Sequence, residues 1–87
     1  MKFADTRFSR EHGYSLGIET TSGRYYASIP VSNGIVDYEE SYELDSGQYL
    51  LFLTDQTAAL KFVDACRRHE HDRLLIQKPG SNRGTPV

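Results

Sequence analysis

The sequence predicts a small α+β domain in which a three-stranded antiparallel meander is covered on one face by two C-terminal helices. Three observations support this fold class. Apolar and polar residues alternate in three runs before residue 45, an Asn-Gly dipeptide separates the last two runs, and apolar residues recur every three or four positions after residue 55. Because 87 residues make one domain with a modest core, we expect the domain to span residues 1–77 and a flexible C-terminal tail to span residues 78–87.

The predicted strands span residues 14–20, 24–32 and 35–44, and we interpret residues 1–13 as an irregular or short helical lead-in. These strands place one set of apolar side chains on a common face: Tyr14, Leu16, Ile18, Tyr25, Ala27, Ile29, Val31, Val36, Tyr38, Tyr42 and Leu44.

The dipeptide Asn33-Gly34 favours a type I′ turn, whose two central residues both need a positive φ. A two-residue loop of this kind pairs Ser32 with Ile35 and continues the register from there along both strands. The same register gives the hairpin a second, polar and acidic face.

Two residues conflict with this pattern. Pro30 cannot donate a hydrogen bond within a central strand, which is resolved if residues 14–20 are too short to reach it. Glu40 falls on the apolar face, and either a bulge or exposure at the end of the sheet would accommodate it.

Two helices follow the sheet. Asp45 or Ser46 can cap a short helix that ends near residue 53, and Thr54 or Asp55 can cap a second one, residues 56–71. The apolar stripe of the second helix comprises Ala59, Leu60, Phe62, Val63 and Cys66. Residues 74–76 fit either the last helical turn or a short fourth strand.

The composition bounds the location of the protein. A single cysteine cannot form an internal disulfide, which favours a reducing, cytoplasmic location. The first residues lack the continuous apolar segment of a signal peptide, and no apolar run approaches the length of a membrane span.

Charge is divided unevenly along the chain. Residues 25–60 contain six acidic residues and no Lys or Arg, whereas residues 61–87 contain six basic and three acidic residues. Such a layout implies either a dipolar molecule or pairing between the sheet and the C-terminal third.

Few residues suggest catalysis or metal binding. Cys66 and His69 share a helical face, but Cys66 continues the apolar stripe, which indicates a buried, inert thiol. His69 and His71 point in different directions on a helix, so a metal site would need Cys66, Glu70 and His12 as further ligands, without the paired spacing of a zinc site. We therefore expect no enzyme activity, metal or cofactor, and a role for Cys66 and His69 is a minor alternative.

Nucleic-acid binding through the basic C-terminal third is a further alternative. The residues that could contact phosphate are Arg67, Arg68, Arg73, Lys78 and Arg83. The aromatic residues lie among the acidic ones instead, so we do not expect nucleic acid to be the partner.

The leading interpretation is a small protein-binding module, because tyrosine among carboxylates suits a protein interface. Its expected contact residues on the polar hairpin face are Tyr26, Asp37, Glu39, Ser41 and Glu43. A basic protein is the expected partner, and an inhibitor or immunity-type protein that covers a basic substrate groove is the most specific version. No membrane partner is expected, and the open sheet edge leaves a homodimer as an alternative.

Overall fold

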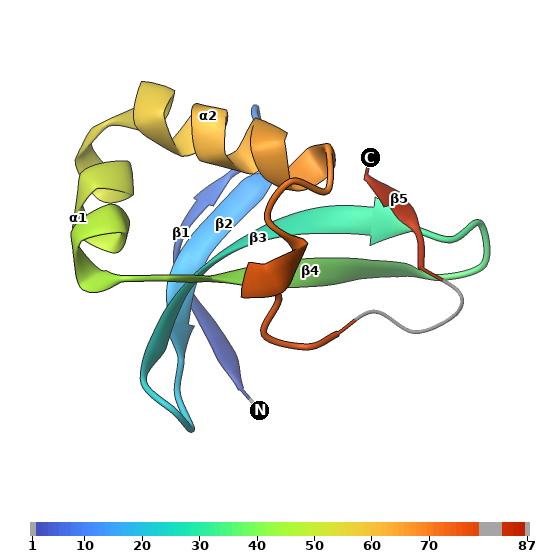
Figure 1. The fold of residues 1–87 in the computed structure, drawn as a ribbon, viewed down its shortest axis with the longest axis horizontal. Helices are drawn as coiled ribbons and strands as arrows, with labels where there is room; N and C mark the ends of the chain where they lie inside the picture. The colour runs from blue at the N-terminus through green and yellow to red at the C-terminus, as the bar shows by residue number, and fades with distance from the viewer. Residues whose placement is uncertain (1, 79–82, 87) are drawn as a thin grey trace.

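Four consecutive strands form an antiparallel meander, and both α-helices lie on the same side of this sheet (Figure 1). The computed structural model describes residues 2–78 and 83–86 and confirms the predicted α+β class. Its elements are β1 (Phe3–Ser9), β2 (Tyr14–Glu19), β3 (Arg24–Ser32), β4 (Asp37–Leu44), α1 (Ser46–Thr54), α2 (Gln56–Arg67), the 3₁₀ helix η1 (Asp72–Leu74) and β5 (Thr85–Pro86). Within the described part of the chain, no helix is both long and apolar enough to cross a membrane.

Strand β1 occupies the segment that the sequence predicted to be an irregular or helical lead-in, so that prediction was wrong. The strand pairs with β2, and a bulge at Thr6 shifts its register between Asp5 and Arg7. Because of the bulge, Phe3 and Phe8 lie on the same face although they are five positions apart, an offset that places residues of a regular strand on opposite faces. Both aromatic rings are exposed, so the strand shows neither the alternation nor the burial that sequence analysis detects.

The β3–β4 hairpin closes with a four-residue loop instead of the expected two-residue turn. Ser32 pairs with Asp37, and only Gly34 within the loop has a positive φ, of 87°. The side-chain oxygen of Asn33 accepts the backbone N–H groups of Ile35 and Val36, at 3.0 and 2.8 Å, and so closes the loop without a type I′ turn.

The predicted hairpin register was therefore wrong by two residues. Since side chains alternate with a period of two, this shift leaves each strand residue on its predicted face. Val36 is the exception, because it lies in the loop and is exposed instead of contributing to the core.

The core lies between the sheet and the helices. Its buried residues are Tyr14, Leu16, Ala27, Ile29, Val31, Tyr42 and Leu44 from the sheet, Tyr49 and Phe52 from α1, Ala59, Phe62, Val63 and Cys66 from α2, and Leu75. Tyr25 extends this core at one end, where its ring stacks on Tyr49 with centroids 4.4 Å apart. The core contains most of the predicted apolar face of the sheet and the predicted stripe of α2.

Both helices start at the predicted caps. Asp45 accepts the Gln48 N–H in a capping box, and Asp55 accepts the Ala58 N–H at the start of α2. Helix α2 ends at Arg67, before the expected residue 71. His69 there adopts a left-handed φ of 62°, and the Glu70 N–H bonds back to the Ala65 carbonyl in the Schellman pattern.

Pro30 is accommodated as one of the sequence hypotheses proposed. Pairing between β2 and β3 ends where Ser15 meets Ser28, so β2 does not reach the proline. Beyond that point β5 pairs with the part of β3 that β2 does not reach: Thr85 pairs with Ser32, and Pro86 pairs with Val31 (Figure 1).

Residues 83–86 correct the expectation of a flexible tail over residues 78–87. They pair with β3, and Arg83 forms ion pairs with Glu40 and Asp72. We had expected a bulge or exposure at the end of the sheet to accommodate Glu40, and this expectation was wrong. The Glu40 side chain is only 4% exposed, and the Arg83 guanidinium compensates its charge. The remaining tail residues, 79–82 and 87, lie outside the described residues.

Residues 74–76 combine features of both sequence hypotheses. Leu74 ends the short helix η1, after which Leu75 forms an antiparallel bridge with Tyr42. The Ile76 N–H then bonds to the Ser41 carbonyl at 2.9 Å. The segment thus covers the free edge of β4 with a single bridge and does not form a full strand.

The β2–β3 turn is organised by the carboxylate of Glu19. This group accepts hydrogen bonds from the backbone N–H groups of Lys2, Thr21 and Ser22 and from the Ser22 hydroxyl. The Ser22 hydroxyl and the backbone donors favour the ionised form, and they lower the pKa of Glu19 from 4.5 to about 2.

This pKa predicts how the stability contribution of Glu19 depends on pH. A carboxyl with a depressed folded-state pKa stabilises the fold fully above its unfolded pKa and loses this effect as the pH falls through the folded pKa. The difference in urea midpoint between the wild type and Glu19→Gln should therefore be largest above pH 4.5 and shrink as the pH approaches 2. A difference that stays constant over this range would contradict the assigned role.

Candidate functional site

A row of acidic side chains follows the outer face of β4, the face opposite the helices. Asp37, Glu39, Ser41 and Glu43 occupy every second position of this strand, and together they form what we call the acidic row. At about 3.3 Å per residue, the row extends over about 20 Å. The structure thus brings together four of the five residues that the sequence predicted for the protein-binding site.

Most of the charge in the acidic row is not compensated. Glu43 lies 3.8 Å from Arg24, but both side chains are about half exposed, so this ion pair is weak. The Ser28 hydroxyl donates to Glu39 at 3.3 Å, which orients the carboxylate without neutralising it. Among residues 2–78 and 83–86, no ion pair reaches Asp37 or Glu39.

Tyr26, the fifth predicted contact residue, is fully buried, and its expected exposure was wrong. Its side chain lies on the outer face but extends away from β4 and covers Gly17, its partner on β2. The hydroxyl donates a hydrogen bond to Asp5, and the ring packs edge-on against Phe3. Burial, and then the Asp5 hydrogen bond, raise the pKa of this phenol well above its usual value. Gly17 within an alternating strand was the available signal of such a close approach.

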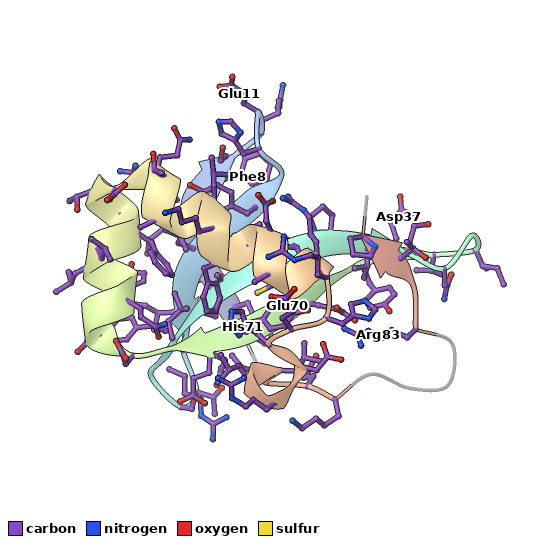
Figure 2. All side chains as sticks on the ribbon, turned by 45° about the horizontal axis from the view of Figure 1, so that its top comes forward. Phe8, Glu11, Asp37, Glu70, His71 and Arg83 are labelled. Atoms are coloured by element: carbon purple, nitrogen blue, oxygen red, sulfur yellow. The ribbon has the colours of Figure 1, made fainter. Side chains whose placement is uncertain are left out.

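The tip of the β3–β4 hairpin adds two residues that sequence analysis missed. Ile35 and Val36 are 89% and 56% exposed, on a loop that projects beyond the helices (Figure 1). A two-residue turn would have placed both residues within β4, and this register error concealed the apolar tip. Figure 2 shows Asp37 next to this loop, so the apolar tip adjoins the acidic row.

The alternative site at Cys66 lacks the environment of a nucleophile. The thiol is buried in the core, and burial raises its pKa to about 12. His69 lies beyond the end of α2 and is exposed, so it does not share the helical face expected from the spacing. His71 stacks on Phe62 with centroids 4.6 Å apart. Among the described residues, no group of three or more His, Cys, Asp or Glu side chains could hold a metal ion.

Internal contacts occupy three of the basic residues considered for nucleic-acid binding. Arg67 donates to the carbonyls of His12 and Gly13 and holds the β1–β2 turn against α2. Arg68 pairs with Glu70, and Arg83 pairs with two carboxylates. Arg67 and Arg83 thus connect distant parts of this fold, whereas the exposed Arg68–Glu70 pair is local.

Comparison of the chain with protein-family models, with curated proteins and with solved structures finds no match in any of the three. The surface chemistry of the chain therefore carries the functional argument.

The packing of Tyr26 predicts that Gly17 tolerates no larger residue. A Cβ atom at position 17 would lie 2.5 Å from the Tyr26 hydroxyl oxygen and would also meet the Ala4 carbonyl. We expect Gly17→Ala to lower the free energy of unfolding by about 1–3 kcal/mol, measured by urea denaturation. The matched variant Gly47→Ala, at the start of α1, should change it by less than about 1 kcal/mol. Equal effects of the two variants would contradict the close packing of Tyr26.

Proposed function

We propose that this chain is a small protein-binding module whose β3–β4 hairpin docks a basic protein. The observation that carries the proposal is the acidic row, in which Asp37 and Glu39 are exposed and no described residue forms an ion pair with them. Aligned charges of one sign steer an oppositely charged partner and accelerate its association.

The apolar tip gives the proposed interface an anchor. Exposed Ile35 and Val36 can enter an apolar pocket of the partner, and the adjoining carboxylates then meet basic residues around this pocket. Interfaces commonly combine a desolvated apolar anchor with a polar rim. Tyr26, which is buried, is no longer part of the proposed contact set.

An inhibitor or immunity-type protein is the most specific version of this proposal. The acidic row would then cover a basic groove of a nucleic-acid-handling protein, where it would take the place of phosphates. A cytoplasmic location is part of the proposal, because the single thiol of Cys66 has no disulfide partner within the chain.

The test is affinity capture from the native lysate, followed by titration of the purified partner against three variants. Glu39→Lys should weaken binding by about tenfold, mainly through slower association, since it places a like charge opposite a basic surface. Ile35→Ser should weaken binding mainly through faster dissociation, since it removes an apolar anchor. Added salt should weaken wild-type binding.

Glu11→Lys is the matched control. Glu11 is 86% exposed at the β1–β2 turn, and its replacement changes the net charge by the same amount as Glu39→Lys. We expect affinity within about twofold of the wild type for this variant, because Glu11 lies outside the proposed contact set and interactions between exposed charges are weakened by salt. The proposal fails if Glu39→Lys and Glu11→Lys affect the captured partner equally, or if the chain captures only copies of itself.

A further inference from the structure

Residues 83–86 lie against the sheet in the manner of a bound peptide. The Arg83 guanidinium donates through Nε and Nη2 to both oxygens of Glu40, at 2.8 and 2.9 Å. Through Nη1 and Nη2 it also donates to both oxygens of Asp72, at 2.7 and 2.9 Å. Two bidentate carboxylates recognise the planar fork of arginine, and the compact ammonium of lysine cannot reproduce this geometry. Figure 2 shows Arg83 beside the hairpin.

The next position accepts only glycine. A Cβ atom on Gly84 would lie 2.5 Å from the carbonyl carbon and oxygen of Ser32, which are backbone atoms of β3 and have little freedom to move. The Gly84 N–H donates to the Tyr38 hydroxyl at 2.7 Å. An Arg-Gly sequence is therefore selected by two separate contacts: the carboxylates of Glu40 and Asp72 select the arginine, and the close approach of the Ser32 backbone selects the glycine.

The following two residues are held through their backbone. Thr85 and Pro86 pair antiparallel with Ser32 and Val31, on the part of the β3 edge that β2 does not reach. An extended segment of another polypeptide can pair with such an edge by β-strand addition, where backbone pairing gives affinity and side-chain pockets give specificity.

We propose that the outer part of the β3 edge, together with Glu40, Asp72 and Tyr38, is a binding site for an extended Arg-Gly segment of a partner protein. The chain's own residues 83–86 occupy this site and compete with the partner within the molecule. The partner's segment supplies an arginine to the two carboxylates, a glycine against Ser32 and a strand beside Val31. This site does not include any residue of the acidic row, so its test is independent of the test of the proposed function.

The test uses the full-length double variant Arg83→Ala/Gly84→Val, which removes the guanidinium and the close fit of the chain's own segment. An acetylated, amidated Arg-Gly-Thr-Pro peptide is titrated into this variant, and the amide shifts of Val31 and Ser32 are followed by NMR. Saturable shifts and a rise in melting temperature are expected. The wild type should bind the peptide at least about tenfold more weakly than the double variant, because its own residues 83–86 already occupy the site.

Peptide specificity separates this site from general charge attraction. Lys-Gly-Thr-Pro and Arg-Val-Thr-Pro peptides should bind the double variant about tenfold more weakly than Arg-Gly-Thr-Pro. Adding Glu40→Gln to the variant should reduce the difference between the arginine and lysine peptides, because only Asp72 then remains as a bidentate acceptor. The proposal is overturned if the three peptides bind equally, or if millimolar Arg-Gly-Thr-Pro shifts neither Val31 nor Ser32. If the double variant does not fold, the same titration and the same criteria apply to Gly84→Val alone, which retains Arg83.

Discussion

The ion pair between Glu40 and Arg83 is the interaction that connects β4 to residues 83–86 and, through Asp72, to η1. Glu40 points into the apolar face of the sheet, where an uncompensated carboxylate would be costly. Arg83 compensates it, Tyr42 donates a hydrogen bond to it, and Asp72 binds the remaining side of the guanidinium. One buried carboxylate on β4 is thereby linked, through the Arg83 guanidinium, to η1 and to the residue that precedes Gly84 and β5. Burial next to Glu40 also raises the pKa of the Tyr42 phenol well above its usual value, which keeps its proton available for this bond.

The alternation of β4 explains why the acidic residues of this strand have different roles. Glu40 faces the core and is paired inside the molecule, whereas Asp37, Glu39 and Glu43 face outward. The inward charge contributes to the fold, and the outward charges remain available to a partner. Arg67 and Arg83 do not pair with the acidic row, since Arg67 holds the β1–β2 turn and Arg83 binds Glu40.

Local patterns predicted those parts of the fold that depend on local physics. The caps at Asp45 and Asp55, the stripe of α2 and the two faces of the hairpin all follow from spacing and side-chain chemistry. The two-residue register error did not change the predicted faces of the hairpin, because a shift by an even number of residues keeps every strand residue on its face. The same error hid the exposed Ile35 and Val36, which lie in the loop that the predicted turn excluded.

The features that sequence analysis missed depend on contacts between distant residues. The bulge at Thr6 interrupts the alternation that would have identified β1. Burial of Tyr26 needs the space above Gly17 on the neighbouring strand, and docking of residues 83–86 needs a carboxylate 43 positions earlier in the chain. Glu40 on the apolar face was itself the signal that a distant cation was required, although the sequence did not indicate which one.

Amide hydrogen exchange in the wild type and in Glu40→Gln tests most directly whether this ion pair positions the C-terminal strand. The Gly84 N–H, which donates to the Tyr38 hydroxyl in the wild type, should exchange at least about tenfold faster in the variant. The amides that form hydrogen bonds between β2 and β3 should keep their protection. Unchanged protection at Gly84 in Glu40→Gln, or equal loss of protection throughout the sheet, would contradict the role assigned to this ion pair.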